Sequence, residues 1–227
     1  MKTTLCHVER SRDIFNNMII SLTGFMGCGK SSVGRKLSEL LCCRFMDLDD
    51  CIVEKAGCSI PEIFAEKGEA EFRKIEQETL KSIVGMSEVD LEAVLALGGG
   101  AVMTAGSEEV VHEGTMCIYL KASVDTLLEH LSGETAGRPM LTQQPIVTGE
   151  NSSVISGDNS SLMPISSPSV MSSEVETSPL RARILKLMAL RAATYERTAH
   201  LIIDTDGKSV DEVATMIVRK ISAYQKQ

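Results

Sequence analysis

The stretch from Gly24 to Ser31 has the residue types and spacing needed to hold a chain of phosphates. It reads Gly-Phe-Met-Gly-Cys-Gly-Lys-Ser, the pattern of two glycines followed by a Lys-Ser pair. In such a loop the backbone N–H groups converge on phosphate oxygens, the lysine reaches the β- and γ-phosphates, and the serine hydroxyl ligates Mg²⁺. The sequence therefore predicts nucleotide binding by Gly27, Cys28, Gly29, Lys30, Ser31 and Ser32, with the Ser31 hydroxyl as a ligand of Mg²⁺.

Residues 44–49 look like a strand that ends in two carboxylates, Asp47 and Asp49. Alternation along a strand puts both side chains on one face, where Asp47 can hold Mg²⁺ through water and Asp49 can accept the proton of an acceptor hydroxyl. Because Asp50 follows directly, an Asp-rich helix cap is the alternative.

Three arginines are candidates for binding anions. Arg73 lies near the start of a predicted helix, where the helix dipole disfavours a cation, so we expect it to meet an anion. Arg191 lies on a later helix that must pack near the same strand ends, and two guanidinium groups together can clamp a carboxylate. Arg138 lies in a Gly-Arg-Pro loop, from which it can swing over a transferring phosphate. A surface salt bridge, or a solvated loop for Arg138, is the plainer alternative in each case.

The predicted elements position these residues at one edge of a sheet. The apolar run 18–22 is a strand before the phosphate loop and 32–41 is the helix after it, which is the arrangement that cradles phosphates. Strands alternating with helices imply an α/β fold with a mostly parallel sheet, which binds ligands at the carboxyl ends of its strands. The other predicted elements are strands at 93–97, 117–120 and 201–203, a helix closed at Gly57, one from Pro61 that breaks at Gly68, a longer one after it, a helix capped by Ser123 and a helix over 210–224.

Composition excludes several classes of protein. The net charge is −8 and there is no Trp, which argues against a nucleic-acid partner. No apolar run approaches the ~20 residues of a membrane helix, and the first residues lack a signal-peptide centre, so we expect a cytoplasmic protein with no membrane partner. The seven cysteines have no Cys-x-x-Cys spacing and are interpreted as reduced thiols, most of them small core residues.

Two segments fall outside this pattern. Residues 1–17 are polar and aperiodic, and we expect a disordered extension ahead of a domain that spans 18–227. Residues 142–179 contain no Lys or Arg and are rich in serine, so we expect a disordered insertion there.

The motifs taken together closely resemble shikimate kinase. They are the phosphate loop, Phe-Met-Asp-Leu-Asp at 45–49, Gly-Glu-x-x-Phe-Arg at 68–73, Leu-Gly-Gly-Gly at 97–100, Arg-Pro-Met-Leu at 138–141 and Arg-x-x-x-Tyr at 191–195. The resemblance implies a three-layer sandwich whose five-stranded parallel sheet has the order 2-3-1-4-5, with a mobile lid. It also implies transfer of the γ-phosphoryl group of ATP to the 3-hydroxyl of shikimate, in aromatic amino-acid biosynthesis. We expect a monomer.

The resemblance also implies roles for single residues. Asp49, Arg73, Gly99 and Arg191 would bind shikimate, Arg138 would be the lid arginine on ATP, and Ser31 would ligate Mg²⁺ with Asp47 beyond a water. Asp49, Lys30 and Arg138 would be the catalytic residues.

Three features depart from the family, and two other functions stay open. Cys28 stands where the family has a small hydroxyl or methyl side chain, the family begins near Met18, and its lid lacks the 142–179 stretch. A gluconate kinase shares the fold but not the combination of Leu-Gly-Gly-Gly with Asp-x-Asp. A catalytically inactive nucleotide-gated binding module is the other alternative, although Lys30, Asp49 and the arginines are all present.

Overall fold

The chain folds around a parallel sheet of five strands in the order β2-β3-β1-β4-β5, as expected. The computed structural model describes residues 18–85, 92–132 and 179–225. The strands are β1 (Ile19–Thr23), β2 (Arg44–Asp47), β3 (Ala93–Ala96), β4 (Met116–Lys121) and β5 (Leu201–Asp204), and the helices are α2 (Lys30–Leu41), α3 (Leu48–Ala56), α4 (Ile60–Gly85), η2 (Ala101–Met103), α5 (Ser107–Gly114), α6 (Val124–Ser132), α8 (Pro179–Thr198) and α9 (Val210–Tyr224). In the central strand, Ile20 pairs with Val94 of β3 and with Met116 of β4.

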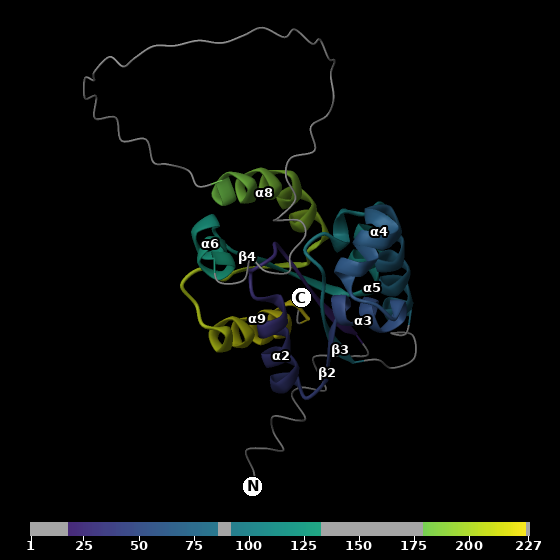
Figure 1. Cartoon of the computed structure of the whole chain (residues 1–227). Coiled ribbons are helices and arrows are strands. Elements are labelled where there is room, and N and C mark those ends of the chain that lie inside the picture. The colour runs from purple at the N-terminus through teal and green to yellow at the C-terminus, as the bar shows by residue number, and fades with distance from the viewer. Residues whose placement is uncertain (1–17, 86–91, 133–178, 226–227) are drawn as a thin grey trace, which may run out of the picture.

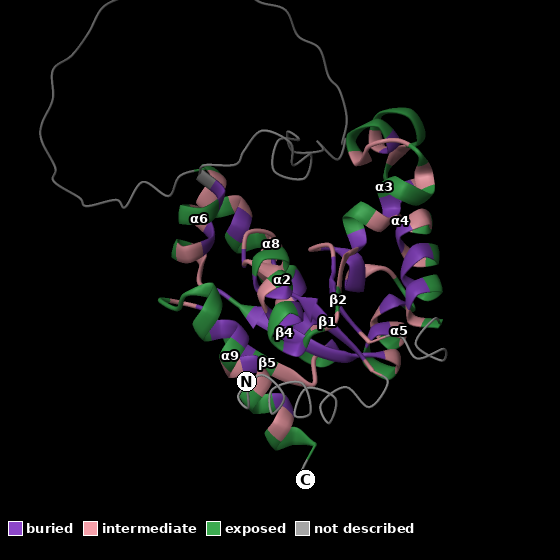
Figure 2. Cartoon of the chain, turned by 90° about the horizontal axis from the view of Figure 1, so that it is seen from below, coloured by how far each residue is buried: buried purple, intermediate pink, exposed green. Residues whose placement is uncertain are grey.

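Helices cover both faces of this sheet (Figure 1). Alternate strand residues point to opposite faces, so the sheet divides the core into two clusters. Ile20, Leu22, Ile118 and Leu120 pack against α2, α6 and α9 on one face. On the other face, Ile19, Leu95, Cys117 and Tyr119 pack against α3, α4 and α5. The buried residues therefore concentrate along the sheet and the inward faces of the helices (Figure 2).

Local sequence signals set several helix boundaries. Ser209 and Glu212 form a reciprocal capping box at the start of α9. Gly68 has a φ of 78°, and this non-helical residue kinks α4 where the sequence predicted a break between two helices. The interruption puts Arg73 within two turns of a bend rather than at a free helix end.

The second predicted strand was too long. It stops at Asp47, and Leu48 begins α3, so Asp49 lies in the first turn of a helix and not on a strand. The reason is that the Asp47 carboxylate accepts a hydrogen bond from the Asp49 backbone N–H at 3.1 Å, which caps the helix. The alternative of an Asp-rich helix cap is thus confirmed. Smaller differences are that β1 begins at Ile19 rather than Met18 and that α2 begins at Lys30 rather than Ser32.

The cysteines are less uniformly buried than expected. Cys28 and Cys117 are buried, Cys42 is exposed, and Cys43, Cys51 and Cys58 are partly buried, all six as free thiols. Cys42 ends α2 in the left-handed conformation, with a φ of 53°, which accounts for its outward position. Only two of the six described cysteines are therefore core residues in the full sense.

Several predictions fall on residues outside the described ranges. They are the extension at 1–17, residues 142–178 of the predicted insertion, and Arg138. Pro179, the last residue assigned to that insertion, is the first residue of α8. Across the described ranges, none of the helices has the length and apolar character needed to cross a membrane.

Candidate functional site

A cavity of about 750 Å³ opens at the carboxyl ends of β1, β2 and β3. Its wall on one side is the phosphate loop, and its wall on the other side comes from α4, α8 and the Gly98–Gly100 turn. The residues of the predicted site that line it are Gly27, Gly29, Lys30, Ser31, Ser32, Asp47, Asp49, Arg73, Gly99 and Arg191. The topology thus brings together residues that are up to 164 positions apart, from Gly27 to Arg191.

The phosphate loop presents uncapped helix N–H groups to this cavity. Gly24, Gly27 and Gly29 have φ values of 142°, 83° and 88°, which L side chains rarely adopt, so the loop shape depends on glycine. Gly29 precedes α2 and has no side chain to cap it. The first N–H groups of a helix need an acceptor, and a phosphate oxygen provides one at the positive end of the helix dipole.

Lys30 is bound to the loop itself. Its Nζ donates to the carbonyl oxygens of Gly24 and Phe25, both at 3.0 Å. These contacts keep the ammonium group beside the loop, where the lysine of a phosphate loop is needed to reach the β- and γ-phosphates. Binding a nucleotide would exchange carbonyl acceptors for charged phosphate oxygens, which form stronger hydrogen bonds with an ammonium donor.

Ser31 and Asp47 form the oxygen pair expected of a magnesium site. The Ser31 hydroxyl donates to Asp47 Oδ2 at 2.7 Å, while the other carboxylate oxygen caps α3. Mg²⁺ prefers hard oxygen ligands and keeps several of its waters, so one hydroxyl and one carboxylate beside the phosphates fit its needs. In the described part of the chain, no cluster of three His, Cys, Asp or Glu residues offers an alternative all-protein metal site.

Two carboxylates and an arginine line the wall of the cavity that lies opposite the phosphate loop. Arg73 Nη1 donates to Glu76 at 2.7 Å, and Nη2 donates to Glu69 at 3.3 Å. A methyl group at Gly98 would lie 3.1 Å from both Asp49 Oδ1 and Glu76 Oε1, so glycine at this position lets the two carboxylates flank the turn. Burial raises the pKa of Glu76, and the nearby Asp49 raises it further, while Arg73 opposes both effects. Burial lowers the pKa of Arg73, but the charges of Glu76 and Glu69 outweigh it and the pKa is raised.

Arg191 reaches the same cavity from α8. It is only 8% exposed, and its Nη1 donates to the Gly99 carbonyl at 3.2 Å. Tyr195, one turn later on the same helix, donates its hydroxyl to the same carbonyl oxygen. Burial raises the pKa of Tyr195 to about 12, so this hydroxyl remains a donor at neutral pH. One carbonyl therefore joins α8 to the Gly98–Gly100 turn.

Two of the predicted site residues are not among those that line the cavity. Arg138 lies outside the described residues. Cys28 is 4% exposed and belongs to the core cluster under α2, and its backbone N–H is donated to the Phe25 carbonyl. The loop motif did not predict this burial, because it does not specify which side chains of the loop face the core.

Sequence reasoning missed Glu76 and His130, both of which line the cavity. Glu76 had a signal, because it occupies a position of the buried stripe of α4 that otherwise holds Phe72, Thr79, Leu80 and Ile83. A carboxylate on a buried stripe needs a partner, and Arg73 three residues earlier is within reach. His130 had none, because its contact depends on how α6 packs against the loop.

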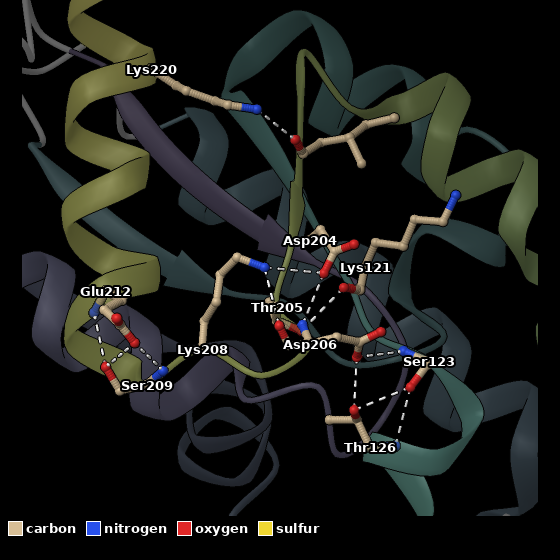
Figure 3. A network of polar contacts seen from close by, with 11 residues as sticks. Lys121, Ser123, Thr126, Asp204, Thr205, Asp206, Lys208, Ser209, Glu212 and Lys220 are labelled. Carbon is tan, nitrogen blue, oxygen red and sulfur yellow. Dashed lines mark hydrogen bonds and ion pairs between the residues drawn. The ribbon is translucent and has the colours of Figure 1, made fainter.

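A polar network supports the neighbouring end of the sheet (Figure 3). The Asp206 carboxylate accepts from the Ser123 backbone N–H at 2.9 Å and from the Thr126 hydroxyl at 2.7 Å. These hydrogen bonds lower the pKa of Asp206, the one from the Ser123 backbone being the largest cause. They tie the β5–α9 turn to the start of α6, the helix whose last turn reaches the phosphate loop.

Comparison with known proteins gives one consistent result. Residues 26–160 match the family model for shikimate kinase. The chain is 35% identical over 202 residues to the shikimate kinase of Thermus thermophilus, covering 89% of each chain. It is 34% identical over 206 residues to that of Geobacter sulfurreducens, covering 91% of this chain and 92% of the relative. Among solved structures, the shikimate kinase of Acinetobacter baumannii in complex with shikimate aligns with a TM-score of 0.73 and 28% identity, over 96% of this chain and 99% of that one.

Proposed function

The chain belongs to the shikimate kinase family, and we propose that its cavity holds ATP and shikimate side by side, for transfer of the γ-phosphoryl group to the 3-hydroxyl. The reaction is the ATP-dependent phosphorylation of shikimate in aromatic biosynthesis. The geometry of the site supports the roles proposed for single residues, and experiment must test them.

The observation that carries the proposal is the surroundings of the Arg191 guanidinium group. Its guanidinium group is buried and donates to the neutral carbonyl of Gly99, so within the described ranges it meets no carboxylate at salt-bridge distance. A buried cation of this kind is costly without an anion, and the opening beside it is the cavity. A carboxylate on the acceptor would add to the charge of Glu76, which acts on Arg191 without a salt bridge, and Arg73, on the same wall of the cavity, would be its second donor.

Asp49 is placed to act on the acceptor hydroxyl. It lines the cavity, and a Cβ at Gly98 would lie 3.1 Å from its Oδ1. In the proposed step the hydroxyl oxygen forms a bond to the γ-phosphorus, the bond from that phosphorus to the bridging oxygen of ADP breaks, and Asp49 accepts the hydroxyl proton. Lys30 and the uncapped N–H groups of α2 hold the phosphates, and Gly99 lines the acceptor pocket.

Mg²⁺ would be held by Ser31 directly and by Asp47 through water. The bound ion neutralises charge on the phosphates. Arg138, placed by sequence in the loop after α6, would reach the ATP phosphates. A cytoplasmic monomer remains the expectation from sequence for the state in which the enzyme works.

The test is ADP release by the purified chain with shikimate, with gluconate or with no acceptor. We expect release only with shikimate, and a product phosphorylated on the 3-hydroxyl by NMR. Asp49→Asn is the matched control for the chemistry. Release with gluconate would instead favour the related sugar-acid kinase, and ATP binding without release for either acid would favour a binding module.

A further inference from the structure

We propose that His130, on the last turn of α6, is a positioning residue that holds the phosphate loop in the shape required for ATP. The proposal rests on the proposed function in one respect, namely that this loop binds the nucleotide. It concerns a residue that no motif of the sequence singled out.

The first observation is a hydrogen bond between distant parts of the chain. His130 Nδ1 lies 2.8 Å from the carbonyl oxygen of Gly27, and 103 positions separate the two residues. A carbonyl oxygen can only accept, so Nδ1 carries the proton and the imidazole is the donor. Both residues line the cavity.

The next residue of α6 packs against the same glycine. A Cβ at Gly27 would lie 3.0 Å from Leu131 Cγ and 3.1 Å from its Cδ2, and Leu131 is fully buried in the core. Gly27 also has a φ of 83°. The last turn of α6 thus contacts Gly27 with a polar group and with an apolar one, which fixes where this corner of the loop can lie.

The peptide unit between Gly27 and Cys28 is held at both ends. His130 binds its carbonyl oxygen, and its N–H is donated to the Phe25 carbonyl at 3.2 Å. A carbonyl oxygen turned into the cavity would repel phosphate oxygens, whereas N–H groups attract them. Fixing this peptide keeps its carbonyl on His130 and leaves the amides that follow it, from Gly29 onward, to face the cavity.

The contact from His130 differs from the one made by Lys30. Lys30 holds the Gly24 and Phe25 carbonyls, but it must turn to the phosphates when nucleotide binds. His130 comes from a different element and can keep its bond to Gly27 throughout. It is therefore the contact that preserves the loop once Lys30 has changed partners, a supporting role of the kind that precise sites require.

The test compares His130→Ala, which removes the donor, with His130→Asn, whose amide N–H replaces Nδ1–H. We expect His130→Ala to raise the KM for ATP and the Kd for ADP roughly fivefold, the usual worth of one hydrogen bond, with the KM for shikimate and kcat changed less than about twofold. His130→Asn should restore most of the ADP affinity, measured by calorimetry without catalysis.

His112→Ala is the matched control. His112 Nδ1 also pairs with a backbone carbonyl, that of Thr198 at 3.0 Å, but away from the cavity, so this variant should lower the melting temperature and leave ADP affinity unchanged. Unchanged ADP affinity in His130→Ala, or no recovery in His130→Asn, overturns the inference while wild type still phosphorylates shikimate. If wild type itself failed to bind ADP, the proposed function would be at fault instead.

Discussion

The two sides of the cavity that we propose for the nucleotide and for the acceptor are built in different ways. The proposed nucleotide side is mainly one continuous stretch, residues 24–32, with His130 beside it, and its polar groups are mostly backbone amides at the start of α2. The acceptor side is assembled from side chains on separate elements, with Asp49 from α3, Arg73 and Glu76 from α4, and Arg191 from α8. Backbone amides survive substitution and side chains do not. Recognition of phosphates should therefore depend on Lys30 and on the shape of the loop, which its glycines and the His130 contact maintain, whereas recognition of the acid should depend on the side chains of a few residues.

The two sides also differ in their charges before any ligand binds. On the nucleotide side Lys30 donates to neutral carbonyls, and on the acceptor side Arg73 is already paired with Glu76 and Glu69. Of the two acceptor arginines, Arg191 has the charge that most needs a ligand, while Arg73 must share its donors. This difference gives the two arginines separable effects.

The largest effects are expected from substituting Asp49 on the acceptor side and Lys30 on the nucleotide side. Asp49→Asn should lower kcat by a factor of about 10³, within the range of general base catalysis, and should leave ATP affinity within about twofold. Lys30→Ala should lose both ATP affinity and turnover, because its ammonium group serves the phosphates. Steady-state kinetics with calorimetry for ATP measures both quantities. Near wild-type kcat in Asp49→Asn would show that this carboxylate does not act on the acceptor hydroxyl.

The next effect concerns the buried arginine. Arg191→Lys keeps the positive charge but removes the planar pair of donors, and we expect the KM for shikimate to rise at least about thirtyfold, equivalent to ~2 kcal/mol. The KM for ATP should stay within about twofold. Arg73→Lys should have a smaller effect, because Glu76 and Glu69 already share that side chain. If each substitution raised the KM for ATP as much as the KM for shikimate, these arginines would not be residues that bind the acceptor.

This contrast also explains what the sequence revealed. Features made of adjacent residues could be predicted from the sequence, because the glycines, Lys30 and Ser31 must follow one another in a phosphate loop and a strand must precede them. The alternation of predicted strands and helices likewise indicated a mostly parallel sheet, while the order of its five strands was an expectation from the resemblance to shikimate kinase. Contacts that depend on how the chain folds locally or packs could not be predicted from the sequence. The strand end at Asp47 was missed because a cap depends on a single hydrogen bond, and the His130 contact depends on how α6 packs.

A third prediction compares the pH dependence of stability on the two sides. The pKa of Asp206, beside the nucleotide side, is lowered by hydrogen bonds, so its stabilising contribution is present above the unfolded pKa and is lost as pH falls. The pKa of Glu76 is raised, chiefly by burial, so its contribution is greatest at low pH and is lost as pH rises through its folded pKa.

The two variants should therefore diverge in opposite directions. Asp206→Asn should cost about 1 kcal/mol near neutral pH, as for a lost helix cap, and its deficit relative to wild type should shrink on acidification. The free energy of unfolding of Glu76→Gln should be closest to that of wild type, or exceed it, near neutral pH. On acidification it should fall relative to wild type. Urea unfolding at several pH values between 4 and 8 measures both. If the difference in unfolding free energy from wild type changed with pH in the same direction for both variants, burial would not be the cause of the raised pKa of Glu76.

The smallest expected effect comes from deleting the serine-rich stretch, residues 145–178. Sequence predicts this stretch to be a disordered excursion from the lid, and a longer loop costs little, since each doubling of its length adds only ~0.6 kcal/mol of closure entropy. A chain that joins Gln144 directly to Pro179, the first residue of α8, should fold and keep its kcat. Any change should appear on the nucleotide side, as a modest shift in the KM for ATP, because Arg138 precedes the deletion in the same loop. The acceptor side, built on α3, α4 and α8, should keep its KM for shikimate. Kinetics beside the full chain decide the matter: a fall in kcat beyond about tenfold, or ~1.4 kcal/mol of barrier, would show that the stretch is part of the working lid, and a change confined to shikimate would reverse the assignment of the two sides.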